Sequence, residues 1–154
     1  MKKVNNIEFK KAMSNFATGV TIVSINHKNN FIGKTVSSFS SLSLKPPLVL
    51  FSLDKKASSL KLFLNSKYIG INILQKNQKN LSIFYSKKEK KNNNNNFFLS
   101  DKKVPLLKEG LVNLECKLSK KHMAGDHIIF ICEVISTKIL KSKKPMIYFK
   151  NKYL

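Results

Sequence analysis

Two segments in the C-terminal half of the chain each have one continuous apolar face at a period of two residues, and this pattern constrains the fold most. In Leu111–Lys120 one face consists of Val112, Leu114, Cys116 and Leu118. In His127–Thr137 the corresponding face consists of Ile128, Phe130, Cys132 and Val134. Because side chains alternate between the two faces of a β-strand, both segments are predicted to be long strands with one buried face.

Apolar and β-branched runs predict the other strands, which are Val20–Ile25, Phe31–Phe39, Leu48–Leu53, Tyr68–Leu74 and Met146–Phe149. The turn His27–Asn30 predicts a hairpin between the first two of these, with His27 in solvent. Gly33 indicates a bulge or a close approach of another part of the chain. Leu48–Leu53 is apolar throughout, which predicts a strand covered on both faces.

Three short helices are predicted, at Asn5–Phe16, Leu60–Asn65 and Gln78–Tyr85. In the first helix Phe9, Met13 and Phe16 form one apolar stripe, which is expected to pack into the core. Many strands with few short helices predict a mainly β fold, a β-barrel with peripheral short helices.

The length of 154 residues predicts one domain, residues 1–154, and the sequence on both sides of Lys87–Asn96 is needed to complete one core. Lys87–Asn96 is rich in Lys and Asn and is expected to be a mobile surface loop. No run approaches the roughly 18 apolar residues of a membrane span, and no signal peptide is visible, so a cytoplasmic location is expected. Cys116 and Cys132 have no metal-binding spacing and are expected to be buried thiols.

The formal net charge of +21 comes from 29 basic residues, all of them lysine. Such a charge raises the possibility of binding to nucleic acid or to an anionic membrane. Nucleic-acid readers favour the arginine guanidinium, which contacts bases and phosphates through two parallel hydrogen bonds. The abundance of Lys and Asn without Arg instead indicates the codon bias of an AT-rich genome, and nucleic acid is an unlikely partner.

The stretch Thr35–Ser59 is a candidate binding segment. Five serines and a threonine lie between Thr35 and Ser43, directly before an apolar strand. The cluster Thr35, Ser37, Ser38, Ser40 and Ser41 offers short hydroxyls near a strand end, which suits phosphates and heterocycle edges. Lys55 and Lys56 add positive charge for a phosphate. On spacing alone, a serine-rich edge strand explains the cluster equally well.

Two shorter motifs lie near the C-terminus. Gly125-Asp126-His127 predicts a tight turn that places His127 at the start of a strand. Tyr148-Phe149-Lys150 places aromatic surface beside a cation. The chain lacks a P-loop, a GxGxxG motif, an HExxH motif and a Ser-His-Asp arrangement. If the protein is an enzyme, a bound cofactor is therefore expected to carry the chemistry.

Taken in order, the segments resemble the flavin reductase family, which has the FMN-binding split-barrel fold. The matching segments are FKKAMSNFATGVTIVS, GKTVSSFSSLSLKPPLVLFSLDKKASS, YIGINIL, LVNLECKL, GDHIIFICEV and PMIYFKNKY, which are spread over residues 9–153, about nine-tenths of the chain. The resemblance implies hydride transfer from NADH or NADPH to FMN or FAD. It also implies a homodimer with the flavin at the subunit interface, and a separate flavin-dependent monooxygenase that receives the reduced flavin.

The resemblance also assigns roles to individual residues. Thr35, Val36, Ser37 and Ser38 would line the isoalloxazine. Ser40, Ser41, Ala57 and Ser58 would follow the ribityl chain and phosphate, and Asn72 would lie on a strand beside the flavin. His127, Tyr148 and Lys150 would bind the nicotinamide, with His127 positioning it without an obligatory proton transfer.

The chain departs from the family pattern at two places. Lys34 replaces a small or apolar residue, and Lys150-Asn151 replaces Arg-Gly after the aromatic pair. Lysine cannot reproduce the bidentate contact of arginine with a phosphate. This departure keeps open a second hypothesis, a flavin-binding protein without reductase activity, beside the less favoured basic nucleic-acid-binding barrel.

Overall fold

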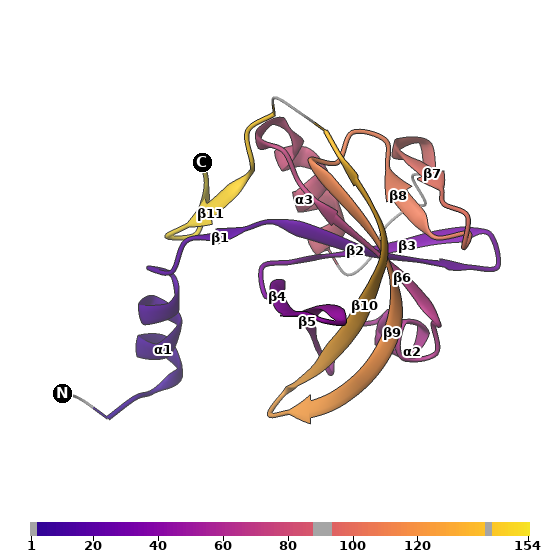
Figure 1. Cartoon of the computed structure of the whole chain (residues 1–154). Helices are drawn as coiled ribbons and strands as arrows, with labels where there is room; N and C mark the ends of the chain where they lie inside the picture. The colour runs from indigo at the N-terminus through magenta and orange to yellow at the C-terminus, as the bar shows by residue number, and fades with distance from the viewer. Residues whose placement is uncertain (1–2, 88–93, 141–142) are drawn as a thin grey trace.

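The computed structural model describes residues 3–87, 94–140 and 143–154, and it contains one large antiparallel sheet (Figure 1). The predicted loop Lys87–Asn96 falls mostly on residues 88–93, outside the described residues. The sheet has the strand order β3-β2-β6-β9-β10-β5-β4. Its strands are β2 (Thr21–His27), β3 (Asn30–Val36), β4 (Ser40–Leu44), β5 (Pro47–Asp54), β6 (Tyr68–Ile73), β9 (Val112–Ala124) and β10 (His127–Ile139). Because β3 also contacts β5, the sheet curls back on itself, and the mainly β prediction is confirmed.

The hairpin of β2 and β3 forms as predicted. Its register runs without a shift from Thr21 opposite Val36 to His27 opposite Asn30. Lys28 and Asn29 form the turn with φ angles of 51° and 64°, the left-handed pair that a two-residue hairpin turn requires. His27 is exposed at the end of β2, as expected.

The predicted strand Phe31–Phe39 is correct as far as Val36 and wrong in its last three residues. The strand β3 ends at Val36, and the chain then continues to β4, which pairs with β5 instead of β2. The segment between Val36 and Ser40 therefore connects β3 and β4, the two edge strands of the curled sheet. Gly33 does mark a close approach, because a Cβ atom there would lie 2.8 Å from the ring of Tyr85.

The two alternating segments form the longest hairpin of the fold. In Figure 1, β9 and β10 extend together beyond the rest of the sheet and turn at Gly125, whose φ is 59°. The strand β10 lies between β9 and β5, so both of its edges are paired. Its apolar face enters the core, where Phe130 stacks on Phe51 with ring centres 5.0 Å apart. Phe63, from α2 (Leu60–Leu64), contacts the same ring edge-on.

The prediction for Leu48–Leu53 is correct for one face only. Val49, Phe51 and Leu53 are buried, whereas Leu48, Leu50 and Ser52 on the other face are partly exposed. The half-exposed face continues onto β10 through Ile129 and Ile131. The sequence pattern did not reveal this asymmetry, because both faces carry apolar residues.

The N-terminal helix α1 (Asn6–Met13) is shorter than predicted and is not packed in the core. The side chain of Asn5 caps it by accepting hydrogen bonds from the backbone N–H groups of Ile7 and Glu8. Phe9, Met13 and Phe16 are 57%, 50% and 68% exposed, so the predicted burial of this stripe is wrong. Figure 1 shows α1 standing to one side of the sheet. The helix lacks a surface to cover its apolar stripe among the described residues.

Short elements surround the large sheet. A second sheet joins β1 (Thr18–Gly19), β11 (Ile147–Phe149) and β12 (Lys152–Tyr153), and β7 (Phe97–Leu99) pairs with β8 (Pro105–Leu107). The remaining helices are η1 (Lys76–Gln78), α3 (Lys79–Ser86) and η2 (Asn94–Asn96). The helix α3 packs against β3. Among the described helices, none has the length and apolar character needed to span a membrane.

Both thiols are buried, as the sequence predicted. Cys116 and Cys132 are 0% exposed, and burial raises the pKa of both, that of Cys132 to about 12. Because the thiolate is the reactive form, both residues should react with Ellman's reagent at pH 8 only at the rate of unfolding. In guanidinium chloride two thiols per chain should be titrated at once. Rapid reaction of the native protein would contradict the buried position.

Candidate functional site

A cavity of about 1000 Å³ lies between α1 and the end of the sheet where β3 leaves the hairpin. We call it the α1 cavity. One wall is the apolar stripe of the helix, and the opposite wall contains Ser37, Ser38 and Ser40 together with Tyr148. A smaller cavity of about 150 Å³ adjoins it, because Ser37 and Tyr148 line both. Its lining also contains Thr35 and Val36.

The hydroxyl-rich segment at this cavity is held in place by its own hydrogen bonds. The Thr35 hydroxyl donates to the carbonyl of Ser82 at 2.7 Å, which ties the end of β3 to α3. The Ser38 hydroxyl accepts from the Ser52 backbone N–H at 2.9 Å and donates to the Ser52 carbonyl at 3.3 Å. Each hydroxyl has one proton and two acceptor positions, so Thr35 retains acceptor capacity for a ligand. The segment Thr35–Ser40, which we call the cradle, is therefore fixed to β5 and α3.

A second group of predicted residues lies at the end of β5. Asp54 pairs with His127, and the turn before β10 is fastened to the chain that follows Asp54. The Lys55 backbone N–H donates to the Asp126 carbonyl at 2.9 Å, and its ammonium group donates to the Gly125 carbonyl at 2.6 Å. Ala57, partly exposed, and Ser58, exposed, follow directly on this loop. Lys55, Ala57 and Ser58 are thus brought to the same corner as His127.

The imidazole of His127 is partly exposed and oriented by its neighbour. Its Nδ1 atom lies 2.7 Å from an Asp126 carboxylate oxygen. This hydrogen bond, with the nearby imidazole charge, lowers the pKa of Asp126. Because this contact uses Nδ1, Asp126 sets the orientation of the ring. The other ring nitrogen, Nε2, is left for a ligand.

The cradle and His127 flank β5 from opposite edges, the cradle on the side of β4 and His127 on β10. Ser38 is hydrogen-bonded to Ser52, and His127 pairs with Asp54, two residues further along the strand. A strand advances about 3.3 Å per residue, so these two positions are about 7 Å apart along β5. The structure therefore brings together two sequence motifs that are separated by almost ninety residues.

One residue of the aromatic motif near the C-terminus, Tyr148, lines both cavities. Tyr148 pairs with Thr18 between β11 and β1, and its ring centre is 5.2 Å from that of Tyr153. Lys150 and Asn151 form the turn to β12 with φ angles of 47° and 61°. The Lys150 ammonium lies 5.3 Å from the ring centre of Phe149, and its backbone N–H donates to the Ser14 carbonyl at 2.8 Å. Lys150 thus joins the end of α1 to the second sheet.

Six predicted site residues line neither cavity, namely Ala57, Ser58, His127 and Lys150, described above, and Ser41 and Asn72. Ser41 is exposed on β4 opposite Val49 and does not line either cavity. Asn72 is 0% exposed, and its amide donates to the Ile22 carbonyl and the Ser24 hydroxyl at 2.9 and 3.0 Å. Its Oδ1 atom accepts from the Leu107 backbone N–H at 2.8 Å. Within the described residues, Asn72 holds β2, β6 and β8 together.

The helix α1 is part of the site, which its sequence pattern did not indicate. Phe9, Met13 and Phe16 line the α1 cavity, although their spacing had predicted core packing. The spacing alone cannot distinguish these two outcomes, because an apolar stripe covers a ligand or a core equally well. Thr18 was also missed, and its buried hydroxyl has no hydrogen-bond partner among the described residues.

The walls fit a planar aromatic cofactor with polar edges. Phe16, Phe39 and Tyr148 offer apolar surface, and Thr18 and Ser37 offer polar groups to the edge of a ring. The described residues contain no group of His, Cys, Asp and Glu that could hold a metal ion. The arrangement is typical of a site that binds an organic cofactor. His127 lies apart from these walls, at the end of β5, in a region that we call the His127 corner.

Comparisons with known proteins agree with this geometry. The sequence pattern of the flavin reductase like domain matches residues 13–154. FMN reductase (NADH) SmoA of Agrobacterium fabrum is 35% identical, over 85% of this chain and 75% of that protein. NADH-dependent flavin reductase StyB of Pseudomonas fluorescens is 30% identical, over 94% of this chain and 86% of that protein.

Solved structures agree as well. The flavin reductase PheA2 superimposes with a TM-score of 0.89 at 34% identity, covering 98% of this chain and 97% of that one. The NADH:FAD oxidoreductase SgcE6 of Streptomyces globisporus, in complex with NAD and FAD fragments, has a TM-score of 0.93 at 24% identity. That superposition covers 100% of this chain and 96% of the other, and it supports the shared fold. The chain therefore belongs to the flavin reductase family.

Proposed function

We propose that the cradle and the α1 cavity bind the flavin and that the His127 corner binds the nicotinamide. The activity is NAD(P)H-dependent reduction of a flavin, FMN or FAD. The observation that carries the proposal is that Ser38 and His127 flank the same end of β5 from its two edges, at Ser52 and Asp54. A flavin seated against the cradle would lie within reach of a dinucleotide held by His127.

A bound flavin would supply the redox chemistry by accepting a hydride at its ring from the nicotinamide. The residues of the chain orient the two partners. Thr35, Val36 and Ser37 line one side of the ring site, and Tyr148 closes it beside the second sheet. Ala57 and Ser58 lie where the tail of the cofactor would run, close to the Lys55 ammonium. The apolar stripe of α1 covers the site and limits the access of water.

His127 acts by position in this proposal. The contact with Asp126 orients the imidazole. Its Nε2 atom would accept a hydrogen bond from the nicotinamide amide N–H when the ring is neutral, and would donate one to a phosphate when the ring is protonated. Tyr148 offers a ring face to the dinucleotide, and Lys150 contributes charge without the two-point contact of arginine. Asn72, enclosed by the strands, is assigned to holding the sheet beneath the site.

The purified protein tests the proposal directly. NADH or NADPH oxidation, followed at 340 nm, should require added FMN, FAD or riboflavin and saturate with flavin concentration. Failure of all six combinations would exclude reductase activity. Flavin binding without nucleotide oxidation would support instead a flavin-binding protein that has lost reductase activity.

The change His127→Ala should raise the KM for NADH by about 10-fold or more, since a hydrogen bond to a charged group is worth about 1.5–3 kcal/mol. The Kd for flavin, measured by fluorescence, should change less than twofold. His122→Ala is the matched control, because His122 is exposed on the same hairpin and lies on β9 opposite Ile129. A larger loss of flavin affinity than of NADH affinity would contradict the assigned role.

A second copy of the chain is the proposed cover for α1. The exposed stripe of Phe9, Met13 and Phe16 and the half-exposed face of β5 and β10 both support a homodimer with the flavin at its interface.

Reduced flavin would pass to a separate monooxygenase. Relatives that carry such names support this, among them the reductase subunit HsaB of a flavin-dependent monooxygenase from Rhodococcus jostii. Two free buried thiols fit a reducing compartment such as the cytoplasm.

A further inference from the structure

A second concave site lies at the other end of the β2–β3 hairpin. The cleft has a volume of about 340 Å³ and is formed by the end of β2, the C-terminal end of α2, the start of β6 and the loop before β8. Six steps along β2 separate Thr21, beside the flavin site, from His27 at this cleft. At about 3.3 Å per residue the two sites are about 20 Å apart. We call this second site the basic cleft.

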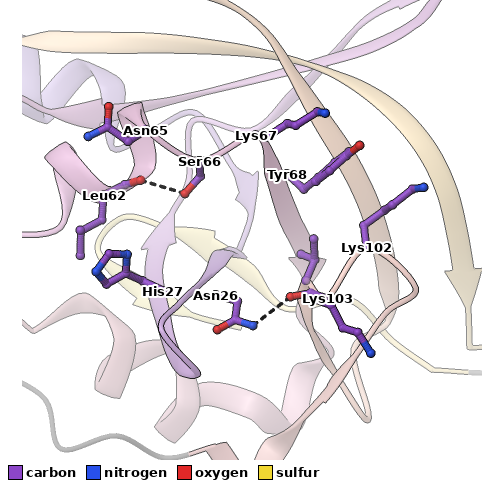
Figure 2. Close-up of a pocket in the computed structure, with 10 residues that line it drawn as sticks. Asn26, His27, Leu62, Asn65, Ser66, Lys67, Tyr68, Lys102 and Lys103 are labelled. Carbon is purple, nitrogen blue, oxygen red and sulfur yellow. Dashed lines mark hydrogen bonds between the residues drawn. The ribbon is translucent and has the colours of Figure 1, made fainter.

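The lining of the basic cleft carries positive charge and no carboxylate. Its cations are Lys67, Lys102 and Lys103, and His27 lies at the same cleft. Figure 2 shows Lys67, Tyr68 and Lys102 extending in the same direction, with the Tyr68 hydroxyl between the two ammonium groups in this view. Among the described residues, no carboxylate forms an ion pair with any of these three lysines. A concave surface of one charge sign concentrates the field and attracts anions.

Hydrogen bonds hold the backbone at each of the three lysines. The Lys103 carbonyl accepts from the Asn26 amide at 3.2 Å, and the Lys102 N–H donates to a Glu115 oxygen at 3.0 Å. The Lys67 carbonyl accepts from the Leu118 N–H at 2.9 Å. The backbone of the cleft therefore needs little ordering on binding, which reduces its cost. Figure 2 shows that Lys103 extends in a different direction from Lys67 and Lys102, so its side chain would have to turn to join them at one anion.

The adjoining loop is seated directly on the sheet. A Cβ atom at Gly70 would lie 2.6 Å from the Pro105 carbonyl oxygen, so the loop is in close contact with β6. Glu115, a nearby carboxylate, is buried, and its oxygens accept hydrogen bonds from Ser136 and from the backbone. The carboxylate therefore holds the backbone at Lys102, and it is not part of the lining of the cleft.

The cleft also has an apolar part. Leu62, Val104 and the ring of Tyr68 line it, and the Lys67 ammonium lies 5.4 Å from the centre of that ring. The volume is near the lower end of the range for sites that hold small organic ligands, about 300–1000 Å³. We propose that the basic cleft binds a small organic phosphate monoester, with the dianion against the lysines and the organic part against Leu62 and Tyr68.

The site is tested by ¹H–¹⁵N NMR titration of the full chain with phenyl phosphate, inorganic phosphate and phenol at constant ionic strength. Phenyl phosphate should give saturable shifts at the amides of His27, Lys67, Tyr68 and Val104. Inorganic phosphate should bind more weakly at the same residues, and phenol should give no shift there. FMN is itself a phosphate monoester, and its shifts should be largest at the cradle.

The double change Lys102→Gln and Lys103→Gln should raise the Kd for phenyl phosphate at least 10-fold. The pair Lys3→Gln and Lys61→Gln is the matched control, because it removes the same charge from exposed residues outside the lining. Absence of saturable shifts would overturn the proposal. Equal weakening of phenyl phosphate binding in both double variants would also overturn it, because that result indicates diffuse attraction to a basic protein. Equal affinity for inorganic phosphate and phenyl phosphate would overturn it as well, because the apolar wall would then contribute nothing.

Discussion

Replacing Ser37 with phenylalanine should weaken flavin binding at least 100-fold, about 2.7 kcal/mol, while the protein remains folded. Ser37 lines both the α1 cavity and the smaller cavity beside it, so an aromatic ring at this position would occupy the space assigned to the isoalloxazine. The side chain is exposed, and its replacement removes no buried contact. The measurement is a flavin titration by fluorescence quenching, with thermal unfolding recorded on the same sample.

A matched variant separates a blocked site from a general effect of an added aromatic ring. Ser119→Phe adds the same volume at an exposed position of β9 that lines none of the cavities described above. It should leave the flavin Kd within twofold of the parent value. Unchanged flavin affinity in Ser37→Phe would contradict the assignment of the cradle, and a large loss in Ser119→Phe would make the first result uninformative about the cavity.

Replacing Phe130 with alanine should lower the free energy of unfolding by about 3–5 kcal/mol. The ring is 0% exposed, stacks on Phe51 and meets Phe63 edge-on, so its removal leaves a cavity between β5, β10 and α2. Since a domain of this kind is stable by only about 5–15 kcal/mol, this loss is a large fraction of the total. Urea unfolding followed by circular dichroism gives the value.

Phe16→Ala is the comparison for that experiment. The Phe16 side chain is 68% exposed in this chain, so the change should cost less than about 0.5 kcal/mol in a monomeric sample. A loss comparable with that of Phe130→Ala would show that the helix is covered in solution. The two variants together therefore compare the loss of unfolding free energy in the core with the loss at the exposed helix.

The alternating pattern predicted the central part of the fold correctly because a buried face imposes a period of two. Cys116, Phe130 and Cys132 are all 0% exposed, as their positions in the alternation required. The strand β4 was missed because its segment, SSLSL, has weak strand propensity and forms by pairing with β5. Pairing partners far apart in the sequence leave no local pattern, and the change of partner after Val36 is such a case.

The candidate site was predictable in its parts but not in its assembly. The hydroxyl-rich run and the Gly125–His127 turn were visible as motifs, and the resemblance to flavin reductases placed both in one site. The link itself, through Ser38, Ser52 and Asp54, depends on which strands are neighbours. The role of α1 was misjudged because a stripe of exposed apolar residues is identical in sequence to a stripe that packs in the core.

The isolated position of α1 affects any measured affinity of the site. A helix of eight residues with no buried side chain has little to stabilise it, since short helices in water form only a small fraction of the time unless other contacts support them. The wall of the α1 cavity is then present only in that fraction of molecules. The apparent Kd for flavin equals the intrinsic value divided by the fraction, so whatever fixes α1 will tighten binding without touching the ligand.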